Sequence, residues 1–155
     1  MPFDELLKEL AAREQRALAM GGTQKLARRK SEGVLNARER VARLFDAGTF
    51  LESGLLAVSN RPADRDTTPA DGKVAGFGRI NGREAAAVAN DFTVKGASSA
   101  AINIKKLKHM KAAAQARGIP IVFLGESTGA RMPDVMGASS IGSKDDPVDY
   151  QRTRY

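Results

Sequence analysis

The segment 119–131 (IPIVFLGESTGAR) constrains the fold of this chain more than any other stretch. Its first six residues are almost continuously apolar, and Ile121, Val122 and Phe123 favour a strand that is buried and covered. At Gly125 the composition changes abruptly to a turn of small residues. Such a turn at the carboxyl end of a strand lets a ligand approach the backbone, so that free N–H groups can hold a negative oxygen. We therefore expect a buried strand that ends in a functional turn.

Three kinds of site are compatible with this turn: a serine nucleophile elbow, a phosphate cradle, and an oxyanion hole without a side-chain nucleophile. The first matches the G-x-S-x-G spacing of residues 125–129. An elbow needs a histidine, which follows the serine in hydrolases of that fold. The single histidine, His109, precedes Ser127 in a lysine-rich segment, and Pro133 interrupts the helix that should follow. A serine hydrolase that uses Ser127 is therefore the least favoured alternative.

Three other motifs give weak signals. The Gly/Ser-rich residues 137–144 have the wrong order of lysine and hydroxyl residue for a phosphate-binding P-loop. The glycines of residues 76–78 lie inside a predicted strand, which disfavours a dinucleotide-binding turn. His109 has no His, Asp or Glu nearby at ligand spacing, so we expect no metal bound by this chain.

Composition narrows the function classes. The net charge of +7, from 25 Lys and Arg against 18 Asp and Glu, suits nucleic acid or an anionic small molecule. Only 5% of residues are aromatic and there is no Trp, so we expect no nucleic-acid partner. The absence of cysteine excludes disulfides, thiolate metal sites and cysteine catalysis. No signal peptide and no apolar run of about 20 residues is visible, and we expect a cytoplasmic protein without membrane contact.

Amphipathic and basic helices are expected in the first 48 residues. Apolar residues at helical spacing predict a helix over residues 3–20, from Phe3, Leu6, Leu7, Leu10 and Leu18. A basic helix at 23–30 and a helix at 37–45, capped by Asn36, follow. The charges favour a solvated helical face, and a docking arm for another subunit is the alternative.

The pattern becomes β-like after residue 48. We expect, in order, a strand at 50–52, a polar loop at 61–73, a hairpin of 74–80 and 83–89, a helix that ends at Arg117 and Gly118, and a strand at 119–124. Asn81 and Gly82 supply the positive φ angles of a type I′ hairpin turn. Ser98 and Ser99 are predicted to cap the helix. This order indicates an α/β layer.

The oxyanion interpretation follows from that order. Strands separated by one helix usually lie adjacent and parallel, so the loop at 90–97 and the turn at 125–131 should meet at one edge of the sheet. Gly129 and Ala130 allow close approach to their backbone, and Arg131 adds positive charge. Three lysines would place further charge near that crevice, which suits an anionic cofactor: Lys95, Lys105 and Lys106.

Four segments, taken in order, resemble biotin-dependent acyl-CoA carboxyltransferase subunits. They are 38–52 (RERVARLFDAGTFLE), 71–82 (DGKVAGFGRING), 90–96 (NDFTVKG) and 126–131 (ESTGAR). The resemblance covers most of the chain from residue 31 to about residue 137. The family includes the β subunits of acetyl-CoA and propionyl-CoA carboxylases and related decarboxylase subunits. Several motifs in the correct sequence are far more specific than any one of them.

The resemblance implies a crotonase-like (ClpP/crotonase) ββα superhelix, of which this chain would contain a part. The implied divisions are a helical arm at 1–48, a partial carboxyltransferase N-domain at 49–142 and a tail at 143–155. The implied reaction is carboxyl transfer from carboxybiotin, carried on another protein or domain, to the α-carbon of an acyl-CoA. An enolate would be held by the backbone N–H groups of Gly129 and Ala130, which match the family's oxyanion-forming turn.

Substrate contacts are expected from both loops. The loop at 90–97 matches the family's loop beside the acyl-CoA, whereas Lys95 and Lys105 are assigned to phosphate contacts from their charge and place alone. The family usually has a second glycine where this chain has Thr128, so the loop or the acyl pocket is expected to differ. The predicted substrate-binding residues are Phe92, Thr93, Val94, Lys95, Gly96, Ala97, Ser127, Thr128, Arg131 and Lys105.

Partners are also implied. They are a biotin carboxyl carrier, a biotin carboxylase, a C-terminal carboxyltransferase half and, in the full-length protein, further copies of itself. Family members are several times longer and contain two crotonase-like domains, so we expect a fragment, a truncated product or one piece of a split enzyme. Residues 1–155 alone are then expected to be inactive. The alternative is a non-catalytic subunit for acyl-CoA binding or assembly.

Overall fold

The fold is built on a mixed sheet of four strands. The computed structural model describes residues 2–132, and its strands are β1 (Leu51–Glu52), β2 (Lys73–Ile80), β3 (Arg83–Asn90) and β4 (Ile121–Leu124). Their spatial order is the order along the chain. β1–β2 and β2–β3 are antiparallel pairs, whereas β3 and β4 are parallel. The crossover between the parallel strands is made by α4 (Ala101–Arg117), as expected for a strand–helix–strand unit.

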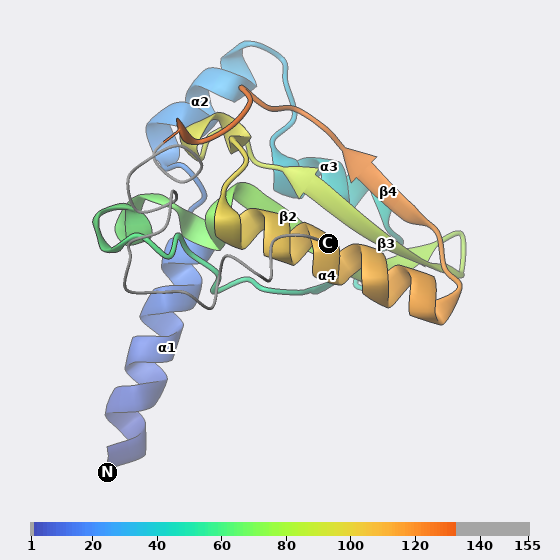
Figure 1. Cartoon of the computed structure of the whole chain (residues 1–155), viewed down its shortest axis with the longest axis horizontal. Helices are drawn as coiled ribbons and strands as arrows, with labels where there is room; N and C mark the ends of the chain where they lie inside the picture. Colours follow the sequence, from blue (N-terminus) through green and yellow to red (C-terminus); the bar gives the residue numbers. More distant parts are fainter. Residues whose placement is uncertain (1, 133–155) are drawn as a thin grey trace, which may run out of the picture.

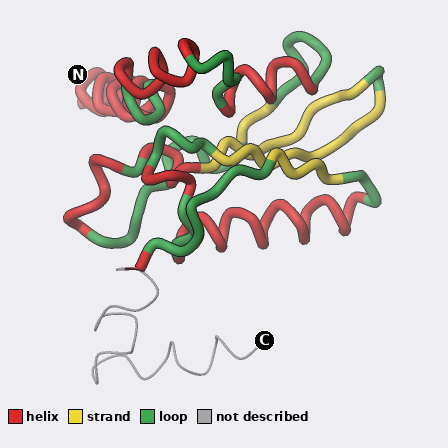
Figure 2. Tube along the Cα trace, turned by 90° about the horizontal axis from the view of Figure 1, so that it is seen from above, coloured by secondary structure: helices red, strands yellow, loops and turns green. Residues whose placement is uncertain are grey.

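Helices lie on both sides of the sheet. Figure 2 shows the N-terminal helices on one side and α4 on the other. These N-terminal helices are α1 (Pro2–Leu18), α2 (Thr23–Ser31) and α3 (Ala37–Leu44), and α1 extends away from the sheet (Figure 1). Most of the large apolar residues of α1 are exposed, including Phe3, Leu6 and Leu7.

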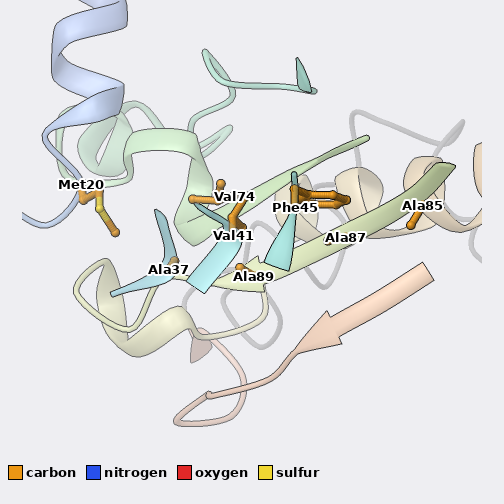
Figure 3. Packing of buried hydrophobic residues seen from close by; sticks show 8 residues of the cluster. All are labelled: Met20, Ala37, Val41, Phe45, Val74, Ala85, Ala87 and Ala89. Atoms are coloured by element: carbon orange, nitrogen blue, oxygen red, sulfur yellow. The ribbon is translucent and has the colours of Figure 1, made fainter. Parts of the chain in front are cut away.

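Small residues let helices approach both faces of the hairpin. Alternate residues of β3 point to opposite faces. On the face of α3, Ala85, Ala87 and Ala89 are buried in a cluster (Figure 3) with Met20, Ala37, Val41, Phe45 and Val74. On the face of α4, Ala86 and Val88 pack with Ala75, Met110 and Ala114. The alanine-rich β3 thus has two buried faces because it lies between two helical layers.

The predicted hairpin turn and the predicted Asn36 cap are confirmed. Asn81 and Gly82 have φ angles of 49° and 77°, as a type I′ turn requires. The carboxylate of Asp46 accepts hydrogen bonds from both of their amides, at 3.0 and 2.8 Å. Asn36 caps α3: its side chain accepts from the Glu39 amide, and the Glu39 carboxylate accepts from the Asn36 amide.

Three sequence-based expectations about local structure are wrong. Strand β4 is only partly buried, with Phe123 48% exposed, because β3 alone pairs with it among residues 2–132. Ser98 and Ser99 do not cap α4, because its N-cap residue is Ala100 and the Asn103 amide in its first turn donates to the Asp71 carboxylate. The polar loop at 61–73 contains the 3-10 helices η1 (Pro62–Thr67) and η2 (Pro69–Gly72), with buried residues at its end.

The expected placement of Lys106 is also wrong. Its charge was expected near a crevice, but the residue is 8% exposed and its ammonium donates to the backbone carbonyls of Gly54, Ala70 and Lys73. Burial lowers the pKa of Lys106 from 10.5 to about 8, although the nearby carboxylate of Glu52 opposes the shift. The side chain therefore holds three carbonyls in place instead of meeting solvent.

This buried lysine predicts a dependence of stability on pH. Between pH 8 and 10.5 the unfolded state binds more protons at Lys106 than the folded state, so the free energy of unfolding should rise with pH. Relative to Lys106→Met, the wild type should gain up to about 1.4 kcal/mol per pH unit in this range. Urea unfolding from about pH 7 to about pH 10 measures this difference. Lys108→Met, on the exposed face of the same helix, is the control. A difference in unfolding free energy between wild type and Lys106→Met that does not change with pH would contradict the prediction.

Candidate functional site

The loop after β3 and the turn after β4 meet, as the strand order predicts. The Thr128 amide donates to the Gly96 carbonyl at 3.0 Å, and the Ser127 hydroxyl donates to the Ala97 carbonyl at 3.2 Å. Ser99 forms a parallel bridge with Ala130. The two segments are therefore joined by backbone hydrogen bonds at the carboxyl ends of the two parallel strands.

The loop after β3 contains an unusual run of left-handed residues. Lys95, Gly96 and Ala97 have φ angles of 48°, 61° and 52°. A Cβ on Gly96 would lie 2.6 Å from the side chain of Thr128, so only glycine at position 96 leaves room for that side chain. Thr128, which stands where the resemblance predicts glycine, thus packs directly against the neighbouring loop. This contact explains how a larger residue is accommodated in the turn.

The predicted oxyanion residues are exposed at the tip of the turn. Gly129 has a φ of 114°, and its amide donates to the Ser127 hydroxyl at 3.1 Å. Ser99 donates to the Gly129 carbonyl and accepts from the Arg131 amide, so the Ala130 amide is directed away from Ser99. Among residues 2–132 we find no hydrogen-bond acceptor for the Ala130 amide.

The hydroxyl of Ser127 is part of the turn. It contacts the carbonyls of Ala97 and Gly129 and accepts from the Gly129 amide. Within the described part of the chain we find no hydrogen bond between Ser127 and His109, which is exposed on α4. The geometry gives the serine hydrolase alternative no support. Pro133 and residues 137–144 lie outside the described residues.

A buried ion pair anchors the end of the turn. Arg131, predicted to add charge to the crevice, is 6% exposed, and its guanidinium donates to the carboxylate of the fully buried Asp71 at 2.8 Å. The second oxygen of that carboxylate accepts from the Asn103 amide at 2.9 Å, in the first turn of α4. Asp71 lies in one of the segments that carry the resemblance, but nothing in its local sequence indicates this ion pair. Asp71 thus connects η2, α4 and the turn.

The residues before the left-handed run are mostly buried. Thr93 and Val94 are 4% and 1% exposed. The Asp91 carboxylate accepts from the amide and hydroxyl of Thr93, and burial raises the pKa of Asp91, although these hydrogen bonds oppose the shift. Thr93 also accepts from the Gly21 amide and from the Lys25 ammonium. The junction of α1 and α2 therefore rests on this loop.

The two lysines assigned to phosphate contacts differ in their surroundings. Lys95 is 41% exposed, and its ammonium lies 3.4 Å from the Asp64 carboxylate. Lys105 is exposed on α4. Phe92 lies under the guanidinium of Arg29, 5.2 Å from the ring centre. The structure thus brings 92–97 and 127–131 together, while the charge of Lys95 is already shared with Asp64.

A basic groove, which sequence reasoning missed, adjoins this loop. It has a volume of about 850 Å³ and lies between the end of α1, the start of α2 and residues 55–69. Its cationic side chains are Arg13, Arg16, Lys25 and Arg65, and Asp66, 3.7 Å from Arg16, also lines it. Lys25 contacts the Thr93 carbonyl and so links the groove to the loop. The positive charges come from segments far apart in the sequence, which local patterns do not reveal.

Residues 2–132 contain neither a cluster of metal ligands nor a membrane-spanning helix. They contain no group of three or more His, Cys, Asp or Glu side chains arranged to hold a metal ion. Their helices are all too short or too polar to span a bilayer.

Known proteins with similar sequences are subunits of methylmalonyl-CoA decarboxylases and propionyl-CoA carboxylases. The chain is 31% identical over 137 residues to the methylmalonyl-CoA decarboxylase subunit alpha of Propionigenium modestum, covering 86% of this chain and 26% of that protein. It is 37% identical over 134 residues to the propionyl-CoA carboxylase beta chain of Cereibacter sphaeroides, covering 84% and 26%. The chain thus spans about a quarter of the length of these relatives.

Similar solved structures and a family model agree with the sequence matches. Transcarboxylase 12S, described as a hexamer with methylmalonyl-coenzyme A and methylmalonic acid bound, matches with a TM-score of 0.79 and 32% identity over 88% of this chain and 28% of that chain. A single-chain long-chain acyl-CoA carboxylase matches with a TM-score of 0.77 and 29% identity over 86% and 15%. The unit β2–β3–α4–β4 is thus part of a crotonase-like fold, as the resemblance implies. Because the family model for the carboxyl transferase domain matches residues 28–144, this chain belongs to that family, the acyl-CoA carboxyltransferases of biotin-dependent carboxylases.

Proposed function

We propose that this chain provides the acyl-CoA side of a carboxyltransferase site. The observation that carries this proposal is the hydrogen-bonded junction of the two loops, with the amides of Gly129 and Ala130 at its exposed tip. In the proposed reaction the α-carbon of the acyl-CoA loses a proton and gains the carboxyl group. Carboxybiotin, held by parts outside this chain, would supply the carboxyl group, and a proton on its ring nitrogen would balance the broken N–CO₂ bond.

The turn would act through its backbone. Removal of the α-proton moves negative charge onto the thioester oxygen, and N–H groups already aimed at that oxygen stabilise it without reorganisation. The Ala130 amide is available, whereas the Gly129 amide donates to the Ser127 hydroxyl. We expect the thioester oxygen to replace this hydroxyl as the acceptor. Ser127 would thus occupy the oxyanion position until substrate arrives.

An anionic cosubstrate also fits the charge of the molecule. The basic groove adjoins the loop at 90–97 through Lys25, Lys95 lies in that loop, and Lys105 lies on α4. The phosphates of an acyl-CoA would be attracted by these cations. We expect Arg16→Gln and Arg65→Gln each to weaken acyl-CoA binding by up to about tenfold, whereas Arg117→Gln, at the far end of α4, leaves it unchanged.

Completion of the site is proposed to need further parts. These are a C-terminal carboxyltransferase half, a biotin carboxyl carrier and a biotin carboxylase, in a complex with several copies of this chain. A polypeptide restricted to residues 1–155 would then bind acyl-CoA and carry out no carboxyl transfer by itself. The divisions at residues 48 and 142 remain part of this proposal.

Calorimetric titration of the chain with acetyl-CoA and propionyl-CoA tests the binding step, and no heat of binding would contradict it. Addition of a C-terminal half and carboxybiotin tests the chemistry. Transfer on addition is expected, whereas binding without transfer would favour the non-catalytic alternative. Carboxylation by the chain alone would contradict its proposed incompleteness. Ser127→Ala should retain transfer in the complete assembly, because the hydroxyl takes no part in bond making.

A further inference from the structure

A cluster of three charged side chains links the N-terminal helices to the turn. The carboxylate of Glu126 accepts hydrogen bonds from Arg29 of α2, at 2.5 and 2.6 Å, and from Arg40 of α3, at 2.6 Å. The side chains of Glu126, Arg29 and Arg40 are 24%, 14% and 22% exposed, so the pairs are partly shielded from water. Figure 1 shows the chain after β4 passing beside α2.

The same residues also reach the other loop. The Arg29 guanidinium lies over the ring of Phe92, and the Asn90 side chain donates to the Glu126 carbonyl at 3.0 Å. Asn90 is itself held by the ammonium of Lys73 at 2.7 Å. Glu126 is thus fixed through its side chain to the helices and through its backbone to the end of β3. Two residues later, the Thr128 amide bonds to the opposite loop.

The charge of the carboxylate is favoured in this cluster. Although partial burial raises the pKa of Glu126, the hydrogen bonds and positive charges of Arg29 and Arg40 outweigh it, and the pKa lies below its ordinary value. Two guanidinium groups on one carboxylate give charge-assisted hydrogen bonds in a defined geometry. Such a group suits a structural anchor better than an acid or base that exchanges protons near neutral pH.

We propose that Glu126, clamped by Arg29 and Arg40, is a positioning residue that sets the loop at 90–97 against the turn at 126–131. Its effect on acyl-CoA affinity rests on the proposed function, whereas its effect on the loops does not. The N-terminal helices are then more than a solvated face, because α2 and α3 hold the turn that carries Gly129 and Ala130. The clamp acts through the backbone of the turn, at a distance from the reacting atoms.

Hydrogen exchange of the 155-residue chain tests the clamp directly. In Glu126→Gln and Arg29→Lys, the amides that join the loops should exchange about tenfold faster, while those of the β2–β3 hairpin keep their rates. The diagnostic amides are those of Ser99, Thr128 and Arg131. Arg29→Lys retains the charge but loses the planar guanidinium that lies over Phe92, and it serves where Glu126→Gln folds poorly.

The matched control is the ion pair of Arg38 and Glu52. It joins α3 to β1 with 24% and 12% exposed side chains, and we find no hydrogen bond from it to either loop in residues 2–132, although the charge of Arg38 acts on Asp91. Glu52→Gln should lower stability without selective exchange at the loop amides. Equal exchange patterns in Glu52→Gln and Glu126→Gln would overturn the positioning role, because they would show only general destabilisation.

Acyl-CoA titration separates this inference from the proposed function. If the wild type binds acyl-CoA, Glu126→Gln and Arg29→Lys should weaken binding about tenfold, and Glu52→Gln should not. Unchanged affinity together with unchanged loop exchange would overturn the clamp and leave the proposed function standing. Selective loop exchange in a chain that binds no acyl-CoA would support the clamp and contradict the proposed function.

Discussion

Replacement of Asp71 by Asn is expected to lower the free energy of unfolding by about 3–5 kcal/mol, or the melting temperature by about 10–20 °C. Asp71 is completely buried, and its carboxylate balances the buried guanidinium of Arg131. Loss of one partner of a buried pair leaves the other charge in a poorly solvated place, which costs far more than an exposed pair contributes. Asn keeps the shape and tolerates the φ of 43° at this position, so the lost charge dominates.

Urea unfolding measures this effect, and two variants control it. Glu84→Gln removes an exposed pair with Arg117, whose side chains are 53% and 47% exposed, and should change stability by less than about 1 kcal/mol. The double variant Asp71→Asn, Arg131→Met should be more stable than Asp71→Asn alone, because it removes both charges. Equal losses in Asp71→Asn and Glu84→Gln would contradict the anchoring role of Asp71.

Replacement of Gly76 by Ala is expected to destabilise the chain by about 2–3 kcal/mol. A Cβ at this position would lie 2.2 Å from the Leu51 carbonyl oxygen and 2.8 Å from the Phe50 ring. These contacts are with backbone and a packed ring, so β1 would have to move away from β2. The loss of stability arises from the steric clash alone, because Gly76 lies within β2 and its φ is not in the left-handed region.

Gly125→Ala is the matched control. Its added Cβ would meet no atom within 4 Å among the described residues, and its φ is not positive. Thermal unfolding should therefore show a melting temperature close to that of the wild type. A loss for Gly125→Ala as large as that for Gly76→Ala would show that glycine matters at both sites for a reason other than close approach.

The local elements could be predicted because their causes lie within a few residues. Asn81 and Gly82 specify a hairpin turn through their own φ angles, and Asn36 and Glu39 complete a capping box within one helical turn. The meeting of the loops also followed from sequence, because a helix between two strands makes them neighbours and parallel. The local sequence did not reveal why residues 76 and 78 are glycines. The reason is that a Cβ there would collide with Phe45, Phe50 or Leu51, which pack against this strand.

The segment 119–131 shows most clearly which features the local sequence determines and which depend on the folded structure. Its sequence determined a strand and a turn of small residues, and together with three other segments it indicated the family to which the chain belongs. Only the tertiary structure decided that Arg131 points inward to Asp71, 60 positions away, and that Glu126 is held by Arg29, 97 positions away. Periodicity and turn chemistry describe neighbours along the chain. Ion pairs and close packing depend on partners that only folding brings together.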